Sequence, residues 1–336
     1  MNKFIIYIGS DLAKKSNYNS SMETLSELLI KEKYTVQKSS NKINKVFRLL
    51  EMCLTVIKNR KNVDYIIVDT FSTVNFYYAF IISQLARTLV VKYIPVLRGG
   101  DLPKRIKKSR WMSNLIFNHS YHNIAPSGYL KYEFKKQGYS TRLIPNIIPI
   151  DSYIFKERKK IAPKLLYVRA FAEIYNPKMA IEVLFLLKKS YPKAILCMVG
   201  PVKDASFEAV KELVKKYNLD DSVEFTGVLP KDKWHQKSKD FGIFINTTNY
   251  DNTPVSVMEA MALGLPIVST NAGGMPYLVR DNIDGILVEK NNSEQMTAAI
   301  IKLISENNQE LSIAARKKVE TFRWEVVKEE WFKILL

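Results

Sequence analysis

Short apolar runs alternate with longer stretches of helical periodicity along the whole sequence, and this alternation constrains the fold more than any other feature. Strand-like runs separated by helical stretches are typical of parallel sheets covered by helices on both faces. The sequence therefore predicts an α/β protein. The expected strands of the first half are 3–9, 34–38, 64–69, 89–97, 122–125 and 141–144, and those of the second half are 164–168, 194–200, 222–227, 241–246, 266–270 and 285–288.

The chain has 336 residues, about twice the length of an ordinary domain, so we expect two domains. A charged and proline-bearing stretch, 145–163, interrupts the alternation near the middle and is the natural boundary. The last segment is rich in aromatic residues, which must be buried against another part of the fold. The sequence thus predicts a first domain over 1–155, a second over 156–318 and a C-terminal helix over 319–336.

Composition and the length of the apolar runs exclude several classes of protein. With 47% hydrophobic and 25% charged residues, the chain has enough apolar mass for large cores and is not of the disordered type. Its apolar runs are shorter than the roughly 18 residues that cross a bilayer, and we expect no signal peptide. Cys53 and Cys197 lie in apolar segments and cannot form a disulfide framework. We expect a protein of the reducing cytoplasm.

The positive charge is concentrated in the first half of the chain. Residues 1–160 contain 28 Lys and Arg against 11 Asp and Glu, an excess of 17, whereas residues 161–336 contain 23 against 22. Such an excess attracts an anionic partner: nucleic acid, an acidic lipid surface or a phosphate-bearing substrate. Nucleic acid is the least expected of these, because we find neither a nucleic-acid-binding module nor a set of stacking aromatics.

A polar loop over 246–254 follows an expected strand and leads into a well-marked helix. Thr253 is a suitable N-cap, Pro254 suits the first helical turn, and Val255 begins the apolar face of the helix. The free N–H groups and the dipole at such a helix start bind phosphate. The segment therefore predicts a phosphate site at the amino end of this helix.

Two neighbouring features strengthen this prediction. Glu259 lies further along the same helix, where its carboxylate could accept hydrogen bonds from both hydroxyls of a ribose. The alternative is an ordinary surface carboxylate. A glycine turn, 271–276, follows the next expected strand. Ligands collect at such turns, at the carboxyl ends of strands in open α/β sheets.

Residues 251–285 carry three linked motifs: Glu-Ala-Met-Ala-Leu-Gly-Leu-Pro-Ile-Val from Glu259, Gly-Gly-Met-Pro from Gly273 and Asp-Gly-Ile-Leu-Val from Asp284. This stretch strongly resembles the donor-binding domain of family-four glycosyltransferases of GT-B architecture. The resemblance extends upstream through 198–201 and 223–227. It implies two Rossmann-like, doubly wound domains that face each other across a cleft, with a C-terminal helix that crosses back to the first domain.

The resemblance assigns roles to individual residues. Glu259 resembles the second acid of the family's E-x7-E motif, which holds the nucleotide ribose, and Asp251 stands at the first acid, which faces the donor sugar. Arg169 resembles the arginine that neutralises the donor diphosphate. The family's lysine position falls on Tyr175, so Lys178 is the expected substitute.

The resemblance also implies where the rest of the donor lies and how it reacts. Backbone groups around Gly227 and Val228 are expected to meet the base of a UDP- or GDP-sugar, with its phosphates at 253–255. No D-x-D motif, the usual holder of a divalent ion in metal-using transferases, occurs in the sequence, so we expect no metal. Transfer would retain configuration, with the leaving phosphate taking the acceptor proton. His119 and His122 are expected to be surface or core histidines.

Two basic segments of the first half could rest on anionic lipid. In 42–57, apolar residues recur at helical spacing with Lys42, Lys45 and Arg48 off their stripe, and the favoured interpretation is a helix whose apolar side packs on its own sheet. The run 104–111 places four basic residues beside a tryptophan and is the stronger candidate for a membrane contact.

Together these features predict a retaining, metal-independent hexosyltransferase. It would move a hexose from a nucleotide diphosphate sugar to a glycan, carried on a lipid diphosphate at the cytoplasmic face of the membrane. The expected pathway is capsule, lipopolysaccharide or related surface polysaccharide synthesis. Glycosylation of a protein or a small metabolite is the nearest alternative, and a non-catalytic polyanion-binding protein on the same fold is the alternative from another class.

Overall fold

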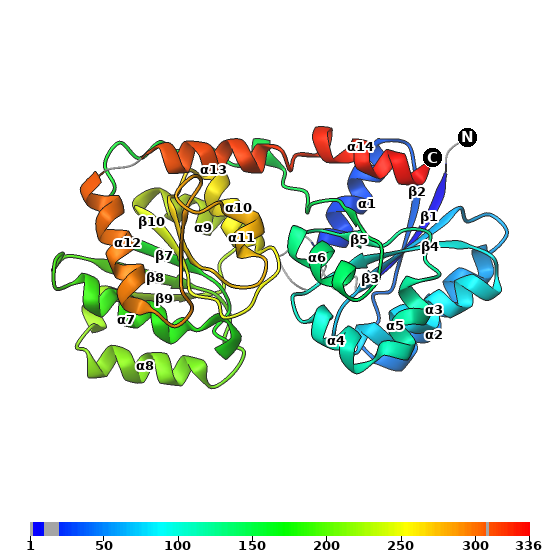
Figure 1. The fold of residues 1–336 in the computed structure, drawn as a ribbon, viewed down its shortest axis with the longest axis horizontal. Helices are drawn as coiled ribbons and strands as arrows, with labels where there is room; N and C mark the ends of the chain where they lie inside the picture. Colours follow the sequence, from blue (N-terminus) through cyan, green and yellow to red (C-terminus); the bar gives the residue numbers. More distant parts are fainter. Residues whose placement is uncertain (1–2, 10–19, 307–308) are drawn as a thin grey trace. The chain divides into compact units, whose positions relative to one another are not determined.

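The computed structural model describes residues 3–9, 20–306 and 309–336. The chain forms two compact units, each with its own parallel six-stranded sheet (Figure 1), which confirms the predicted α/β class. Unit 1 comprises Met1–Ile147 and Trp324–Leu336, and unit 2 comprises Ile148–Arg323. The division thus falls at Ile147, ahead of the expected boundary after residue 155.

The sheet of unit 1 has the order β2-β1-β3-β4-β5-β6, and its strands are β1 (Phe4–Ile8), β2 (Thr35–Ser39), β3 (Tyr65–Thr70), β4 (Lys92–Leu97), β5 (Ile124–Ala125) and β6 (Arg142–Leu143). Its helices are α1 (Ser21–Lys31), α2 (Lys45–Asn59), α3 (Asn75–Thr88), α4 (Leu102–Lys108), α5 (Arg110–Phe117), α6 (Gly128–Lys136) and α14 (Trp324–Leu335). The strand expected over 89–97 begins late, because Leu89 caps α3 and Val90 takes a left-handed backbone with φ of 57°.

Both faces of the unit 1 sheet are buried. Side chains alternate along β1, so Ile5 and Tyr7 join a core with α1 and α14, while Ile6 and Ile8 join a second core with α2 and α3. A strand that is apolar on both sides needs cover on both sides. The unit is therefore doubly wound, as the alternation in the sequence predicts.

The sheet of unit 2 has the order β12-β11-β10-β7-β8-β9, and its strands are β7 (Lys164–Val168), β8 (Ile195–Val199), β9 (Val223–Gly227), β10 (Ile243–Asn246), β11 (Ile267–Thr270) and β12 (Ile286–Val288). Its helices are α7 (Pro177–Leu187), α8 (Ser206–Lys216), α9 (Lys231–Lys237), α10 (Val255–Ala262), α11 (Met275–Leu278), α12 (Ser293–Glu306) and α13 (Glu310–Glu320). Across the described parts of both units, no helix has the length and apolarity to cross a bilayer.

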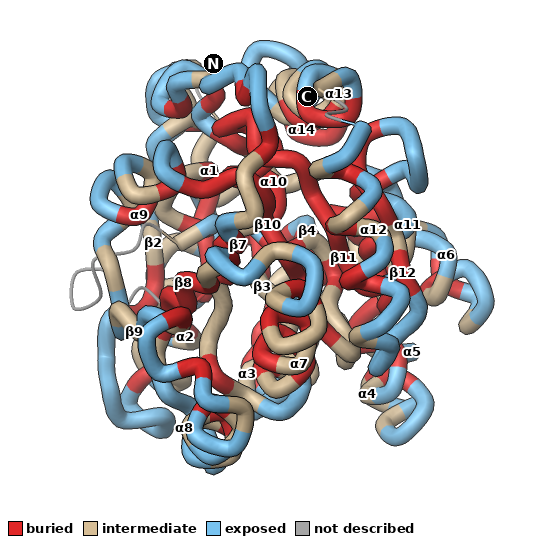
Figure 2. Tube along the Cα trace, turned by 90° about the vertical axis from the view of Figure 1, so that its left-hand side faces the viewer, coloured by how far each residue is buried: buried red, intermediate tan, exposed pale blue. Residues whose placement is uncertain are grey.

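Unit 2 also has a core on each face of its sheet. Leu165 of β7 packs in a core with α7, α8 and α12, whereas the next residue, Leu166, packs with α10 and α13. Figure 2 shows the central strands β8, β10 and β11 as buried. Because all the pairings are parallel, the carboxyl ends of these strands meet at one edge, where the loops are free to form a site.

The last segment is two helices rather than one. Helix α13 ends at Glu320, and α14 starts at Trp324 and belongs to unit 1. The indole of Trp324 is buried and donates a 3.0 Å hydrogen bond to Glu32. The predicted helix over 319–336 is therefore broken after residue 320, and its aromatic part lies in the core of unit 1.

The apolar stripe predicted in 42–57 does not pack against the sheet, although the sequence favours that arrangement. Met52 and Val56 are the side chains that helix α2 buries against the sheet. The six apolar residues of the predicted stripe instead lie on the outer side of the helix, 39–67% exposed: Ile43, Val46, Phe47, Leu50, Leu54 and Ile57. The expectation of an inward stripe is wrong because α2 is apolar on two sides, and periodicity alone cannot choose between them.

Candidate active site

Four polar loops follow strands at the carboxyl edge of the unit 2 sheet. Arg169 comes directly after β7, Gly200 after β8, the segment 247–254 after β10 and the segment 271–274 after β11. The predicted donor-binding residues Arg169 and Asp251 therefore come from neighbouring strands of the sheet, β7 and β10. This edge is where α/β sheets bind ligands.

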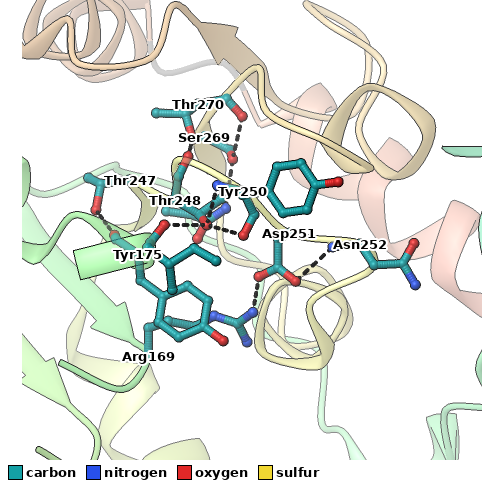
Figure 3. A network of polar contacts seen from close by, with 11 residues as sticks. Arg169, Tyr175, Thr247, Thr248, Tyr250, Asp251, Asn252, Ser269 and Thr270 are labelled. Carbon is teal, nitrogen blue, oxygen red and sulfur yellow. Dashed lines mark hydrogen bonds and ion pairs between the residues drawn. The ribbon is translucent and has the colours of Figure 1, made fainter. Parts of the chain in front are cut away.

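Arg169 and Asp251 meet directly. The guanidinium of Arg169 forms an ion pair with the Asp251 carboxylate, and the ring centroid of Tyr175 lies 4.3 Å from Cζ of the guanidinium (Figure 3). Nε of Arg169 is buried and has no hydrogen-bond acceptor among the described residues. Because a buried N–H without a partner costs free energy, this atom is suited to an oxygen of an anionic ligand.

The loop that carries Asp251 is held from two sides (Figure 3). The hydroxyl of Thr247 donates to the carbonyl oxygens of Tyr175 and Asn176, at 3.0 and 2.8 Å, and the hydroxyl of Thr270 donates to the carbonyl of Thr248. Thr247 and Thr248 are fully buried. Buried hydrogen-bonded loops are rigid, so the position of Asp251 is set before any ligand binds.

The glycine turn after β11 packs against the same loop. The backbone N–H of Gly274 donates a 2.9 Å hydrogen bond to the carbonyl of Asp251. A Cβ at Gly274 would overlap the carbonyl oxygen of Asn252, so only glycine permits this approach. The turn that the sequence singled out therefore supports the Asp251 loop.

Glu259 is a buried carboxylate on α10, 3% exposed, and not a surface group. Its Oε1 accepts a 2.9 Å hydrogen bond from the phenol of Tyr153 and lies 3.0 Å from Nζ of Lys231. Burial and the neighbouring carboxylate raise the pKa of Tyr153, so the phenol stays protonated and donates. Within the described part of the chain, Oε2 of Glu259 has no such partner and is open to a hydroxyl of a ligand.

The start of α10 differs from the prediction. Pro254 is the N-cap, and its carbonyl accepts hydrogen bonds from the N–H groups of Val257 and Met258. Thr253 therefore stands one residue too early to cap the helix, and its hydroxyl is buried with no partner among the residues described. The helix begins at Val255, and its N-cap residue, a proline, gives no side-chain hydrogen bond to the first N–H groups. The cap assigned to Thr253 is wrong, but an uncapped helix start remains.

A family model described as "Glycosyl transferases group 1" matches residues 150–319, slightly more than half of the chain. The matched region contains Arg169, the Asp251 loop and α10. The chain belongs to the group 1 glycosyltransferases.

Curated relatives carry glycosyltransferase names. The match to an uncharacterized glycosyltransferase of Haemophilus influenzae is 34% identical over 46% of this chain and 44% of the relative. The putative colanic acid biosynthesis glycosyltransferase WcaL of Escherichia coli is 33% identical over 38% of this chain and 34% of the relative. The amylovoran biosynthesis glycosyltransferase AmsK of Erwinia amylovora is 28% identical over 47% of this chain and 40% of the relative. This glycosyltransferase thus spans less than half the length of each of these relatives.

Solved structures share the fold over the whole chain. Anabaena HepE in complex with UDP superposes with a TM-score of 0.77, at 17% identity over 99% of both chains. The sucrose-phosphate synthase of Thermosynechococcus elongatus gives a TM-score of 0.82, at 16% identity over 99% of this chain and 98% of that one. The lipopolysaccharide outer core galactosyltransferase WaaB gives 0.72, at 16% identity over 99% of each. These likenesses confirm the two-domain GT-B fold.

In this glycosyltransferase, the turn expected to meet the base joins β9 to α9. Gly227 ends β9 with φ of +66°, a left-handed conformation that favours glycine, and Val228 after it is half exposed. His235 belongs to α9, the helix that follows this turn, and its ring centroid lies 4.8 Å from that of Tyr153. Burial, helped by the ammonium of Lys231, lowers the pKa of His235 to about 4. The histidine is therefore neutral at pH 7.

Lys178 is near the start of α7 and lines a surface groove of about 610 Å³ with residues of α8 and with Asn291. Tyr175, at the family's lysine position, stacks on Arg169 and adds no charge. The ammonium that the structure does bring to a site carboxylate is that of Lys231, at Glu259.

In unit 1, four polar side chains at the carboxyl edge of the sheet form a closed network. Nε of Arg98 donates to Asp69 at 3.0 Å, Nη1 to Asn146 at 2.7 Å and Nη2 to the phenol of Tyr7 at 3.3 Å. Asp69 and Arg98 are almost fully buried, with 8% and 11% of their side-chain surface exposed. The network ties together the segments at the ends of β1, β3 and β4, so its role is to shape this edge of the sheet.

Two site residues have no signal in the sequence. Tyr153 comes from the boundary segment, just after a 3-10 turn over Ile150–Ser152, and reaches Glu259 across 106 residues of sequence. Lys231 is one of many lysines and follows a proline at the start of α9. Only the folded chain brings them to the same carboxylate oxygen.

Proposed function

We propose that this glycosyltransferase moves a hexose from a nucleotide diphosphate sugar to a glycan acceptor. One observation carries the proposal. At the carboxyl edge of the unit 2 sheet, a buried N–H of Arg169 lacks an acceptor, and Oε2 of the buried Glu259 lacks a donor, among the residues described. A nucleotide sugar supplies the matching groups, because its diphosphate accepts hydrogen bonds and its ribose donates them.

The donor is a UDP- or GDP-sugar. Its diphosphate would lie at Arg169 and at the start of α10, formed by Pro254 and Val255, near the hydroxyl of Thr253, which has no partner among the described residues. Its ribose would lie at Glu259, and its base at Gly227 and Val228. The UDP and UDP-glucose complexes of HepE, which has the same fold, support this class of donor.

The hexose itself would face Asp251. Both carboxylate oxygens of Asp251 have a partner, one the guanidinium of Arg169 and the other the backbone N–H of Asn252 at 2.8 Å, so the side chain is fixed in direction. A fixed, partly buried carboxylate discriminates between sugars by accepting hydrogen bonds from particular hydroxyl groups. We therefore assign donor-sugar selection to Asp251, in addition to its support of Arg169.

The second cation of the site is Lys231. Its ammonium lies 3.0 Å from Glu259, with about a third of the side chain exposed, so it can turn from the carboxylate to a phosphate oxygen. Lys178, the substitute expected from the sequence, lines a groove beside α8, and kinetic comparison of the two lysine variants decides between them. Arg169, Lys231 and the helix start would together stabilise the departing nucleoside diphosphate.

The transfer would retain configuration and need no side-chain base. The bond from the anomeric carbon to the phosphate oxygen breaks, the acceptor oxygen bonds to the anomeric carbon on the same face, and the leaving phosphate oxygen takes the acceptor proton. His235, with its low pKa, is a poor proton acceptor at neutral pH. Metal independence is part of the proposal, and turnover in the presence of EDTA tests it.

The acceptor would be a growing glycan on a lipid diphosphate, bound by unit 1 at the cytoplasmic face of the membrane. The names of WcaL, AmsK and WaaB, which place those proteins in colanic acid, amylovoran and lipopolysaccharide synthesis, support a surface polysaccharide pathway. Acceptors of another kind, a protein or a small metabolite, are the nearest alternative. They would be distinguished by the product formed from a labelled donor.

A second candidate rests on charge. The excess of 17 positive charges in residues 1–160 suits a protein that binds polyanions without catalysis. Affinity for a nucleic acid would fall linearly with salt on logarithmic axes, whereas UDP or GDP would saturate one site. The unpartnered groups of unit 2 favour the enzyme, because a surface that binds polyanions does not need them.

The experiment that tests the proposed function is a panel of nucleotide sugars without acceptor. Thermal stabilisation identifies the nucleotide, and slow hydrolysis of the bound donor identifies the sugar. We expect one UDP- or GDP-hexose to stabilise and to be hydrolysed. If no nucleotide sugar in the panel does either, the proposed function is wrong.

A further inference from the structure

The outer side of helix α2 is an unusual surface for a globular unit. It carries six large apolar side chains, 39–67% exposed, which we call the α2 stripe: Ile43, Val46, Phe47, Leu50, Leu54 and Ile57. Five of them lie within α2 and Ile43 just before its N-cap, and their spacing of i, i+3, i+4, i+7, i+11 and i+14 places them on one side of the helix. The inner side of α2 is apolar too, with Met52 and Val56 fully buried. A helix that is apolar on both sides is normally covered on both sides.

The stripe is presented by a firmly anchored helix. The side chain of Asn44 accepts from the N–H groups of Val46 and Phe47 and caps the helix. The buried guanidinium of Arg48 donates to the carbonyls of Lys42 and Ile43, and the phenol of Tyr78 in α3 donates to the carbonyl of Lys45. The exposure of the stripe is therefore a property of the fold, since turning it inward would expose Met52 and Val56 and break the hydrogen bond from Tyr78 to Lys45.

Positive charge flanks the stripe at both ends. Lys42 and Lys45 stand at its start, and Lys58, Arg60 and Lys61 at its end, all of them exposed. The one acid between them, Glu51, is engaged by the hydroxyl of Ser40. Unit 1 as a whole has 26 Lys and Arg against 12 Asp and Glu. A row of apolar side chains with cations at both ends complements a partner that has an apolar interior and anionic groups at its surface.

We propose that the α2 stripe docks unit 1 onto an anionic lipid bilayer. The apolar side chains would enter the boundary between headgroups and acyl chains, and the flanking lysines would reach the lipid phosphates. A second copy of the chain fits the surface less well. In a two-fold pairing of α2 helices, antiparallel or parallel, the cations at one helix end would face cations of the other copy and repel them.

The alternative basic run, 104–111, has exposed cations but a single large exposed apolar side chain, that of Trp111. Lys104 is paired with Asp101 at 3.2 Å, and the guanidinium of Arg105 lies 4.8 Å from the ring centroids of Phe76 and Tyr77. Trp111 is 65% exposed, but its ring contacts Phe80 at 5.7 Å. Arg105 and Trp111 contact neighbours in unit 1, whereas the α2 stripe is an apolar surface that nothing in the described part of the chain covers.

The inference rests on the proposed function in one respect only, that a lipid-linked acceptor gives the docking its purpose. The test is flotation of the full chain with phosphatidylcholine vesicles, with and without phosphatidylglycerol. The test variant is Phe47→Ser with Leu54→Ser, and the control is Ile283→Ser with Val326→Ser, which removes comparably exposed side chains from other surfaces. Thermal melting and donor hydrolysis without vesicles, measured on each variant, report whether the fold and the unit 2 site are intact.

We expect the wild type and the control to float with anionic vesicles, the stripe variant to bind them at least about 10-fold more weakly, and all three to bind neutral vesicles poorly. Equal binding by the stripe variant would overturn the proposal, as would a wild type that binds no vesicle. A wild-type dimer that the stripe variant converts to a monomer, without vesicle binding, would show that a second copy covers the stripe and would also overturn it. Vesicle binding without hydrolysis of any donor would leave the docking intact and count against the proposed function alone.

Discussion

The phenol of Tyr153 donates a 2.9 Å hydrogen bond to Oε1 of Glu259, from a position 106 residues earlier in the chain. The bond turns Oε1 toward the protein and leaves Oε2 for a ligand. Glu259 is thus oriented by a residue outside its own helix and outside the motif that identifies it. A substitution at Tyr153 should therefore weaken the binding of the nucleotide, whose ribose we place at Glu259.

Tyr153→Phe removes this hydrogen bond and keeps the ring. A hydrogen bond to a charged group contributes about 1.5–3 kcal/mol, so we expect the Kd of the nucleotide to rise about 10-fold. Calorimetric titration of UDP and GDP measures the change. Tyr132→Phe, at an exposed tyrosine of unit 1, is the matched control and should leave the Kd as it is. An unchanged Kd in Tyr153→Phe would show that Glu259 does not depend on this bond.

Lys231→Ala and Lys178→Ala separate the two candidate cations. If Lys231 stabilises the leaving diphosphate, its loss should lower kcat/KM about 10- to 100-fold, whereas Lys178→Ala should stay within about 2-fold. Steady-state kinetics with the donor found by the panel give both numbers. Because Lys231 also pairs with Glu259, the affinity for the bare nucleoside is measured alongside. A loss confined to the nucleoside would assign Lys231 to the ribose and not to the phosphates.

The stability of unit 2 should depend on pH through His235. Its pKa of about 4 lies below the value of about 6.5 in an unfolded chain, so the unfolded state binds more protons between these values. Stability is therefore complete above about pH 7 and is lost as the pH falls toward 4. Because the ring is partly exposed, we expect a loss of about 1 kcal/mol between about pH 7 and pH 5.

Urea unfolding of the wild type and of His235→Gln at these two pH values measures the difference. The variant should lose less stability than the wild type over this interval, because it has no imidazole to protonate on unfolding. Equal losses in both proteins would mean that His235 titrates normally in the folded state.

Gly274→Ala should disrupt the Asp251 loop by steric overlap. The backbone of Gly274 has φ of −85°, which alanine can adopt, so the effect comes from the contact of the new methyl with the carbonyl of Asn252. Forcing such an overlap costs about 1–3 kcal/mol or more. Thermal unfolding should show the loss of stability, and added donor nucleotide should restore little of it. A variant as stable as the wild type would mean that the turn has room to move.

Much of the fold could be predicted because the sheets are buried on both faces. Strands such as 64–69 and 243–246 are short apolar runs with polar ends, and the helices between them show their periods. The predictions from the sequence are wrong where the pattern of apolar residues is compatible with two structures. Helix α2 is apolar on two sides, so periodicity could not say which side faces the sheet. At 89–91 the apolar letters continue through a left-handed turn at Val90, which hydropathy does not register.

The candidate site was predictable only in its local parts. The helix start at Val255, the glycine turn and Glu259 lie within one short stretch, and their spacing indicates a nucleotide site. The pairing of Arg169 with Asp251 spans 82 residues, and the contacts of Tyr153 and Lys231 with Glu259 arise from the meeting of distant loops. Sequence patterns carry no information on such contacts, so the orientation of the carboxylates came from the structure alone.

The most direct measurement of the central claim is a calorimetric titration of UDP and GDP into the wild type, Arg169→Met, Glu259→Gln and the exposed control Glu294→Gln. We predict that one of the two nucleotides binds the wild type and the control at a single site with equal affinity, and that both site variants bind it at least about 10-fold more weakly while remaining folded. Wild-type affinity in both Arg169→Met and Glu259→Gln would contradict the claim that the diphosphate and ribose of the donor lie at these residues.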